Sequence, residues 1–364
     1  QKTGEMSGMA ETIKVGILGM GRAGVGMHVR EIAEYPDRFE LVAVADHDPS
    51  RLENPPGVPA QAKRYASCEE LIDDPAVELV SIALRHPEHV PYAIRALEAG
   101  KYVNIDKPIA VNYEEAQKLK ACADRHPGRL FPRQNRRFEG PFQKALQLIS
   151  TGVLGRITLV KLHRACGYCR RNDWMTMTEF SGGLLTNWGP HVIDQALQFI
   201  GSPVADLWAD VRSVISIGDG DDQIKLLLRG ENGVVADLEI SGTNAKPGRE
   251  IEILGERGTL VYDPKAGAIE MRFVDPECEF KPLAPHPENP PMEYGNFDEK
   301  LTFIEQKVEI PFIPMSEIWK HIYASVREGR PFPIRLEEAM EVVRLCDEAF
   351  RRSGFRPATR KNPQ

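Results

Sequence analysis

Residues 13–24 read Ile13-Lys14-Val15-Gly16-Ile17-Leu18-Gly19-Met20-Gly21-Arg22-Ala23-Gly24, an apolar run followed by three spaced glycines. This pattern predicts a buried β-strand that turns at Gly19 and leads into a helix. Gly19 makes the tight turn, Gly21 lets backbone N–H groups approach phosphates, and Gly24 lets the helix pack close to the strand. We therefore expect a dinucleotide pyrophosphate at this helix N-terminus, held by the whole turn: Gly19, Met20, Gly21, Arg22, Ala23 and Gly24.

A second apolar run, Phe39 to Ala45, predicts the next strand, which ends at Asp46. A carboxylate at this position accepts hydrogen bonds from the adenosine ribose and repels a 2′-phosphate, which favours NAD over NADP. The turn that begins at Asp46 offers another interpretation, in which Asp46 only stabilises that turn. His47 and Arg51 keep NADP as the less favoured alternative, because a nearby cation could accept its phosphate.

The composition is that of a soluble globular protein with room for two domains: 364 residues, 42% hydrophobic and 27% charged. The formal net charge is −7, and no basic run carries interleaved aromatic residues, so we expect no nucleic-acid partner. No apolar stretch approaches the ~18 residues needed to cross a bilayer, and the segment up to residue 12 is polar. The sequence therefore predicts a cytoplasmic protein that binds no membrane.

The cysteines are scattered along the chain, at positions 68, 122, 166, 169, 278 and 346, which favours free thiols over a disulfide framework. Cys166 and Cys169 have the spacing of a redox or metal pair. No second pair or histidine cluster completes a four-ligand site, so we expect no metal.

The first part of the chain, to about Arg137, alternates short apolar runs with amphipathic stretches, which predicts crossover helices and a parallel sheet. The expected strands are 13–18, 39–45, 79–84, 102–105 and 130–134. In such a sheet ligands bind outside the carboxyl ends of the strands, so the residues that follow each strand should converge on one crevice. Besides the glycine turn and Asp46, these are Leu84, Arg85, His89, Asp106 and Lys107.

From Gly155 onward most apolar runs read as strands joined by glycine turns, which predicts a largely antiparallel sheet. The expected strands are 157–163, 207–215, 223–228, 234–240, 251–254, 259–262 and 269–274, with helices at 191–200, 315–322 and 339–350. The proline-rich stretch 275–314 is expected to be irregular. We thus predict an α/β protein with an N-terminal Rossmann dinucleotide-binding domain (1–138) and a C-terminal α+β domain (139–364) that contains a large, open, mostly antiparallel sheet.

Three further segments, in a fixed order, turn this general fold into a specific resemblance. They are Ala99-Gly100-Lys101-Tyr102-Val103-Asn104-Ile105-Asp106-Lys107-Pro108, Gln134-Asn135-Arg136-Arg137-Phe138 and Gly182-Gly183-Leu184-Leu185-Thr186-Asn187-Trp188-Gly189-Pro190-His191-Val192-Ile193-Asp194. Together they resemble the AGKHVxxEKP signature, the following strand end and the GGxxxDxGxHxxD motif of the glucose-fructose oxidoreductase, inositol dehydrogenase and rhizopine-catabolism (Gfo/Idh/MocA) family. The resemblance implies a nicotinamide-dependent oxidoreductase of a polyol, sugar or related alcohol or ketone, whose open sheet often serves as an oligomer interface.

By position, the resemblance implies that Lys107, Asn187 and His191 are the catalytic group. The chemistry agrees, because hydride leaves a carbinol carbon only if a base takes the hydroxyl proton, and imidazole suits that task. His191 is therefore the expected base, in the first turn of a helix that Gly189-Pro190 begins. Lys107 follows a strand end, where its ammonium would polarise the substrate oxygen. Asp106 replaces the usual Glu and is expected to contact the nicotinamide ribose or neighbouring backbone.

Asn187 departs from the family pattern, which usually has Asp there. An amide can hydrogen-bond the substrate or orient His191, but it supplies no negative charge to make the imidazole more basic. Asn187 could instead cap the following helix. The loop from Leu84 to His89 also departs from the family form, and Arg85 and His86 either line the cofactor or lie on the loop surface.

Four residues are candidates for substrate contacts beside Asn187 and His191: Arg136, His163, Arg164 and Trp174. The first three lie at or near strand ends, so each could hydrogen-bond a polyhydroxylated ligand. Trp174 could stack on a sugar face or on nicotinamide. The alternatives are a structural ion pair for Arg136, a satisfied core position for His163 and a hydrophobic lid anchor for Trp174.

The sequence favours an NAD-preferring oxidoreductase of a sugar, sugar derivative or cyclitol, which forms a homo-oligomer, a dimer or tetramer, through the C-terminal sheet. A first alternative is a hydrolase or lyase of the same resemblance that retains NAD and uses transient oxidation. A second is a non-catalytic dinucleotide-binding regulator, which only Asn187 supports. Intact Lys107 and His191 favour an enzyme.

Overall fold

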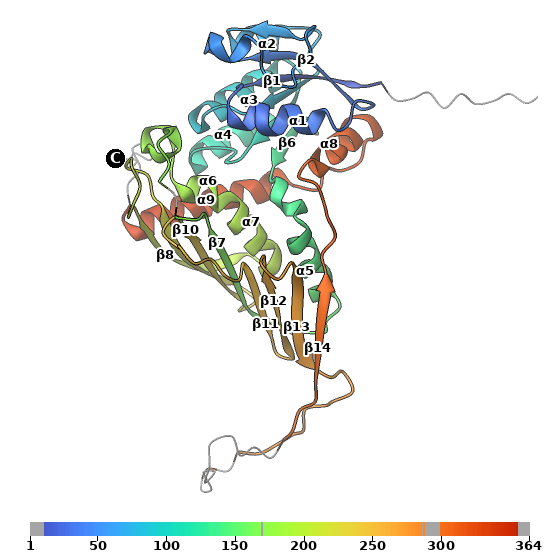
Figure 1. Ribbon diagram of the computed structural model, residues 1–364, viewed down its shortest axis with the longest axis vertical. Helices are drawn as coiled ribbons and strands as arrows, with labels where there is room; N and C mark the ends of the chain where they lie inside the picture. The colour runs from blue at the N-terminus through green and yellow to red at the C-terminus, as the bar shows by residue number, and fades with distance from the viewer. Residues whose placement is uncertain (1–10, 169, 286, 288–298, 356–364) are drawn as a thin grey trace, which may run out of the picture.

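Two β-sheets form the frame of the molecule, one built from residues before 134 and the other from residues after 156 (Figure 1). The computed structural model describes residues 11–168, 170–285, 287 and 299–355. The smaller sheet lies at the top of the view among helices, and the larger sheet lies below it with helices against one face. This arrangement confirms the predicted α/β fold class, in which a Rossmann-like sheet is followed by a second, mostly antiparallel sheet.

The first sheet has six parallel strands in the order β3-β2-β1-β4-β5-β6, the order of a Rossmann fold. Their bounds are β1 Ile13–Leu18, β2 Phe39–Ala45, β3 Lys63–Tyr65, β4 Leu79–Ile82, β5 Tyr102–Asp106 and β6 Leu130–Arg133. β1 and β2 match the prediction to the residue, because both are buried apolar runs. The sequence does not predict β3, whose three residues are mostly exposed and carry no apolar alternation.

Helices cover both faces of this sheet, and each face has its own buried apolar cluster. The helix after the glycine turn begins as a π-helical segment, a form that is frequent at functional sites. The helices of this part are η1 (Gly24–Val29), α1 (Arg30–Ile32), η2 (Pro49–Leu52), α2 (Cys68–Asp73), η3 (His86–Glu88), α3 (His89–Glu98), α4 (Tyr113–Ala123) and η4 (Asn135–Phe138).

The second sheet has eight strands in the order β14-β13-β12-β11-β7-β10-β9-β8. Their bounds are β7 Ile157–Ala165, β8 Val204–Arg212, β9 Gln223–Gly230, β10 Val235–Ser241, β11 Ile251–Gly255, β12 Gly258–Asp263, β13 Ala268–Val274 and β14 Phe303–Glu309. Neighbours pair antiparallel except β7 and β10, which are parallel. β14 corrects the expectation of an irregular stretch up to residue 314. It is a mostly exposed edge strand, so it lacks the apolar alternation that would reveal it.

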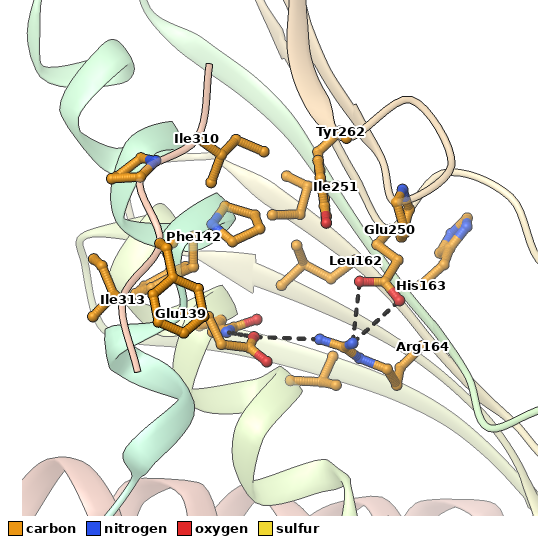
Figure 2. A pocket seen from close by; sticks show the side chains of 18 residues that line it. Glu139, Phe142, Leu162, His163, Arg164, Glu250, Ile251, Tyr262, Ile310 and Ile313 are labelled. Atoms are coloured by element: carbon orange, nitrogen blue, oxygen red, sulfur yellow. Dashed lines mark hydrogen bonds and ion pairs between the residues drawn. The ribbon is translucent and has the colours of Figure 1, made fainter. Parts of the chain in front are cut away.

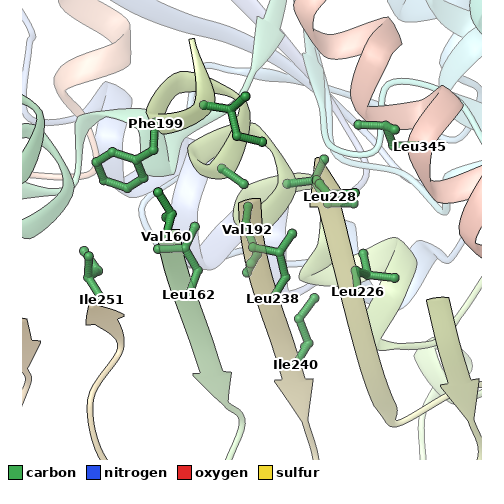
Figure 3. Close-up of a cluster of buried hydrophobic side chains, with 14 of the residues drawn as sticks. Val160, Leu162, Val192, Phe199, Leu226, Leu228, Leu238, Ile240, Ile251 and Leu345 are labelled. Carbon is green, nitrogen blue, oxygen red and sulfur yellow. The ribbon is translucent and has the colours of Figure 1, made fainter. Parts of the chain in front are cut away.

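Helices cover one face of the second sheet, and the core lies between that face and the helices (Figure 3). The helices are α5 (Gly140–Ser150), α6 (Leu184–Asn187), α7 (Gly189–Ile200) and α9 (Leu336–Ser353), while η5 (Trp174–Thr176) and η6 (Thr178–Phe180) lie in the loop before α6. Strand side chains such as Leu162 and Leu238 meet Val192 of α7 in this core. Trp208 and Leu227, on neighbouring strands, are exposed instead. In the described part of the chain, no helix has both the length and the apolar character that a bilayer crossing requires.

The last part of the chain returns to the first sheet. Helix α8 (Glu317–Glu328) contributes Trp319 to the apolar cluster that contains β1 and β2. The Nε1 of this fully buried tryptophan donates to Glu31 Oε2 at 2.8 Å. Glu31 also accepts two hydrogen bonds from Arg133 Nη2, at 2.6 and 2.7 Å, and Arg133 is fully buried. A buried ion pair thus joins α1, the end of β6 and α8.

Candidate active site

The turn between β1 and η1 has the shape that its glycines predict. Gly19 has a φ of +91°, which glycine adopts without strain. A Cβ at Gly24 would lie 1.9 Å from the Gly19 carbonyl oxygen, so only glycine lets the helix begin this close to the strand. A Cβ at Gly21 would meet only Arg51, at 3.8 Å, so the space beside Gly21 is open. The turn therefore fits a dinucleotide phosphate against its backbone N–H groups.

Asp46 directly follows β2 and lies buried against this turn. Its Oδ2 accepts a hydrogen bond from Met20 N at 2.7 Å, and its Oδ1 accepts one from Asp48 N at 2.9 Å. Asp46 therefore does stabilise its own turn, and it also holds the glycine turn in place. Two further side chains lie beside the carboxylate: Arg51 Nη1 is 3.3 Å from Oδ2, and His47 Nδ1 is 3.6 Å from Oδ1.

Asp46, His47 and Arg51 line a cleft of about 590 Å³ that reaches from the glycine turn to α6 and α7. Met20 and Gly24 lie behind the turn instead, Met20 in the apolar cluster of β1 and Gly24 against Gly19. The cleft joins most of the predicted site residues from both halves of the chain: Gly19, Gly21, Arg22, Ala23, Asp46, Leu84, Arg85, His89, Asp106, Lys107, Arg136, Trp174, Asn187 and His191.

Lys107 follows β5 and reaches across to the second half of the chain. Its Nζ donates to the side-chain Oδ1 of Asn187 at 2.7 Å and to the backbone oxygen of Asn187 at 2.9 Å. Burial lowers the pKa of Lys107 to about 8, against the opposing charge of Asp106. The charges of three arginines lower this pKa further: Arg22, Arg136 and Arg171. The ammonium is thus poised to lose its proton only slightly above neutral pH.

The strand end that carries Lys107 is fixed by its neighbours. Asp106 Oδ1 accepts a hydrogen bond from Lys107 N at 2.8 Å, and Asp106 Oδ2 lies 3.8 Å from His28 Nε2. Burial alone would raise the pKa of Asp106, but His28 and the charge of Lys107 hold it well below its usual range. On the other side, His89 Nδ1 lies 2.8 Å from the Pro108 carbonyl oxygen. These contacts keep Asp106 ionised and hold the backbone on both sides of Lys107.

His191 lies in the first turn of α7, which begins at Gly189 with Pro190 next, as the sequence predicts. Its ring meets Trp188 edge-on, with the centroids 5.9 Å apart. Burial, followed by the positive charge of Lys107, holds the pKa of His191 well below its usual range. The buried Nδ1 of His191 has no hydrogen-bond partner among the described residues. The imidazole is therefore neutral at neutral pH and can accept a proton.

Asn187 ends α6 and contacts Lys107, whereas no hydrogen bond joins it to His191 in the described part of the chain. Nor does it cap α7, whose N-cap residue is Trp188 and which has no side-chain cap. That alternative for Asn187 is therefore wrong. The physical reason is that a buried ammonium needs acceptors, and the two oxygens of Asn187 supply them.

The loop before α6 closes one side of the cleft. Trp174 meets His86 edge-on, with ring centroids 5.0 Å apart. His86 Nδ1 donates to the backbone oxygen of Ser181 at 2.8 Å, and Ser181 has a φ of +55°, which is uncommon outside glycine. Burial holds the pKa of His86 well below its usual range, so one ring nitrogen carries the only proton. His86 is thus a buried residue that lines the cleft and ties the loop to the first sheet. Arg85 lines the cleft as well, with its guanidinium carbon 4.5 Å from the centroid of the Phe180 ring.

His163 and Arg164 line a second cavity of about 520 Å³ instead of the cleft (Figure 2). There Arg164 pairs with Glu250 at 3.1 Å and with Glu139 at 3.4 Å. This corrects the expectation that both residues contact a substrate alongside His191. The reason is that β7 continues to Ala165, so both residues lie within the sheet and not at the end of a strand.

Trp188 lies between the cleft and the second cavity. The guanidinium carbon of Arg136 is 4.4 Å from the centroid of its ring, and that of Arg164 is 5.0 Å away. Arg136 lines the cleft and also pairs with Glu139, so it is both a cleft residue and a member of an ion pair. The sequence does not single out Trp188, since an aromatic residue before a helix carries no signal of its own.

The described residues hold no group of three or more His, Cys, Asp or Glu side chains able to bind a metal. Cys166 lies in the loop after β7, and Cys169, the other cysteine with the spacing of a redox or metal pair, lies outside the described residues.

Comparisons with known proteins match both halves of the chain to one family. Residues 13–134 match an oxidoreductase family with an NAD-binding Rossmann fold, GFO_IDH_MocA, and residues 142–261 match the GFO/IDH/MocA C-terminal domain. The chain belongs to the Gfo/Idh/MocA family. Its first domain is accordingly an NAD(P)-binding Rossmann domain, and the family is one of oxidoreductases.

Relatives within the Gfo/Idh/MocA family align over much of the chain. The chain is 28% identical to scyllo-inositol 2-dehydrogenase (NADP(+)) IolW of Bacillus subtilis, with 94% of each chain covered. It is 29% identical to inositol 2-dehydrogenase 2 of Saccharopolyspora erythraea, over 70% of this chain and 74% of the relative. The WlbA dehydrogenase of Bordetella pertussis, solved in complex with NADH and UDP-GlcNAcA, has a TM-score of 0.72 at 19% identity, with 94% and 97% of the two chains covered. That structure shares the fold.

Within the Gfo/Idh/MocA pattern, Lys107 and His191 are retained and Asn187 stands where Asp is usual. The hydrogen bond from Lys107 Nζ to Asn187 Oδ1 shows the effect of having Asn in place of Asp at position 187. The lysine keeps an acceptor at hydrogen-bonding distance, but that acceptor carries no full negative charge.

Proposed function

We propose that this chain is an NAD(P)-dependent dehydrogenase that oxidises a CH–OH group of a sugar, sugar derivative or cyclitol, or reduces the matching ketone. The observation that carries the proposal is that Lys107 and His191, far apart in the sequence, line the same cleft as the glycine turn. Two relatives named as inositol dehydrogenases, at 28% and 29% identity, support a polyol substrate.

In this proposal the glycine turn and Asp46 would hold the dinucleotide, which would supply hydride transfer at its nicotinamide ring. His191 takes the hydroxyl proton during oxidation and gives it back during reduction. Lys107 donates a hydrogen bond to the same substrate oxygen as negative charge develops on it. Asn187 holds the Lys107 ammonium in position through Oδ1.

A panel of sugars and cyclitols, assayed with NAD and NADP by the absorbance of reduced nicotinamide, tests this function. Steady accumulation of reduced cofactor supports a dehydrogenase. Bond cleavage without accumulation would support the alternative that retains NAD. If calorimetry detects no binding of NADH or NADPH, the protein has neither activity.

For the cofactor, we propose that Asp46 makes NAD the preferred dinucleotide. Replacing Asp46 with alanine should weaken NAD binding by about 10- to 100-fold, because a charge-assisted hydrogen bond to the ribose is lost. The preference for NAD over NADP should narrow, since Arg51 then faces a 2′-phosphate without a competing carboxylate. Fluorescence titration with both reduced cofactors measures the change. Asp48→Ala, on the same turn, is the matched control, and equal NAD and NADP affinity in the parent would contradict the role of Asp46.

The fall of kcat/KM at alkaline pH should follow the loss of the proton from the Lys107 ammonium. Because the ammonium form stabilises the developing alkoxide, kcat/KM should fall about tenfold per pH unit above the Lys107 pKa of about 8. Asn187→Asp adds an opposite charge beside Nζ, which favours the ammonium and should move this fall about one pH unit or more higher. Asn187→Ala removes an acceptor of Lys107 Nζ and should move the fall of kcat/KM to lower pH. Superimposable profiles for the three proteins would show that Lys107 does not set this limb.

We also propose that copies of the chain associate through the second sheet into a dimer or tetramer. Exposed Trp208 and Leu227 on adjacent strands support this, because large exposed apolar side chains side by side favour burial against a partner. Light scattering after size-exclusion chromatography is expected to give a mass at least twice the 40.8 kDa of one chain. A monomer would contradict the proposal.

A further inference from the structure

The cleft near Lys107 offers a substrate mainly hydrogen-bond donors. Lys107 Nζ donates two of its three protons in hydrogen bonds to Asn187. Because an ammonium only donates, Asn187 must face it with Oδ1, and its NH₂ group remains a donor. Arg136 and Arg171 each give one terminal nitrogen to a carboxylate, Glu139 or Asp173. Neither guanidinium makes another hydrogen bond within the described part of the chain, so both have N–H groups to spare.

The carboxylates beside Lys107 and Arg171 are already engaged, although Glu88 and Asn135 also line the cleft with side-chain oxygens. Asp106 accepts from Lys107 N and has its other oxygen toward His28. Asp173 accepts from Met175 N and from Arg171. The ring nitrogen of His191 is committed to the substrate proton in the proposed reaction. A neutral polyol must place the protons of several hydroxyl groups on acceptors, whereas a carboxylate only accepts. The donor-rich lining therefore suits a carboxylate.

The charge distribution leads to the same conclusion. Within the described residues no carboxylate forms an ion pair with Lys107, whose partners are two neutral oxygens of Asn187. The charged groups that act most strongly on Lys107 or His191 include one carboxylate, Asp106, and four arginines at 22, 136, 164 and 171. An oxidised nicotinamide ring brings another positive charge. Three of these arginines already pair with carboxylates: Arg136 with Glu139, Arg164 with Glu250 and Arg171 with Asp173. Lys107 has only neutral acceptors among the described residues, and a buried ammonium of this kind favours an opposite charge bound beside it.

We propose that the substrate supplies this negative charge, and that it is a hydroxy acid of the sugar or cyclitol class whose carboxylate lies near the reacting carbinol. The inference rests on the proposed function and names its substrate class. Arg171 is the specific recognition residue: Asp173 holds one side of its guanidinium, and the remaining N–H groups bind the carboxylate. Arg136 and Lys107 add positive charge in the same cleft.

The test compares acids with neutral partners of the same carbon skeleton: D-gluconate with D-glucitol, D-galactonate with galactitol, D-glucuronate with D-glucose and D-galacturonate with D-galactose. Each compound is titrated by calorimetry into the protein with and without NADH, and each is assayed for reduction of NAD and NADP. We expect at least one acid to bind and to exceed its neutral partner in kcat/KM by about tenfold or more. A neutral compound that equals or exceeds its acid in every pair overturns the proposal, as does the absence of acid binding at about 10 mM, above the usual KM range.

Different measurements reject the dehydrogenase function and the hydroxy-acid substrate class. Absence of NADH binding rejects the dehydrogenase, while the titration of acids without NADH still decides the substrate class. Arg171→Met should lower the acid-to-neutral ratio of kcat/KM about 10- to 100-fold. Arg170→Met is the matched control, because Arg170 donates to the Ile215 carbonyl outside the cleft, and it should leave the ratio unchanged. Asn187→Asp places a carboxylate beside Lys107 and should also lower the ratio. An unchanged ratio in both Arg171→Met and Asn187→Asp overturns the proposal.

Discussion

Replacing His191 with alanine should lower kcat by about 10²- to 10⁴-fold, the usual contribution of a positioned acid–base group. The imidazole lines the cleft, and the described residues offer its Nδ1 no hydrogen-bond partner. Its low pKa keeps it neutral, so it is able to take the hydroxyl proton. The affinity for NADH should change little, because the glycine turn and Asp46, which hold the dinucleotide in the proposed function, make no hydrogen bond or ion pair with His191 among the described residues. Turnover and NADH fluorescence titrations on the same preparation measure both effects.

Added imidazole should restore part of the lost rate, because alanine removes the ring and leaves space for a free one. His126→Ala is the control, since His126 follows α4 and does not line the cleft. A kcat within about threefold of the parent would show that His191 is not the base. Lys107, with a pKa of about 8, would then be the next group to examine.

Replacing Glu31 with alanine should destabilise the protein by about 3–5 kcal/mol, the cost of leaving a buried charge without its partner. Arg133 depends strongly on Glu31, because its Nε and Nη1 have no hydrogen-bond partner among the described residues. The same change leaves the indole N–H of Trp319 without its acceptor. Urea unfolding followed by tryptophan fluorescence measures the free energy of unfolding.

An exposed ion pair serves as the control for the loss of unfolding free energy expected in Glu31→Ala. Glu98 and Arg125 lie 3.3 Å apart on the surface, so Glu98→Ala should cost less than about 1 kcal/mol. A double variant, Glu31→Leu with Arg133→Met, should recover much of the loss, because it removes both buried charges together. If Glu31→Ala alone costs no more than Glu98→Ala, the buried pair does not hold α8 on the first sheet.

Local chemistry made much of the fold and site predictable from sequence. The glycine turn, β1 and β2 depend on neighbouring residues, because a tight turn requires glycine and a buried strand requires an unbroken apolar run. The rule that ligands bind at the carboxyl ends of parallel strands then placed Asp46 and Lys107 in one cleft. By contrast, β3 and β14 are exposed, so their side chains carry no periodic signal.

Contacts between distant segments could not be predicted in this way. Asn187 meets Lys107 across 80 residues, and nothing in either segment shows that the amide faces an ammonium instead of an imidazole. The predicted end of β7 was two residues too early, and this moved His163 and Arg164 into the wrong site. The interior position of His86 depends on the path of the loop that carries Ser181, which the sequence does not define.

The return of α8 to β1 and β2 means that the nucleotide-binding half is not a separable module. A fragment that stopped at residue 138 would leave the apolar surface around Phe39 without its Trp319 cover. Helix α9 adds a second such link through Ala339 and Val343, which pack in the cluster on the other face of the first sheet. The larger sheet is therefore inserted between two stretches of the chain, one before it and one after it, that together build the nucleotide-binding half.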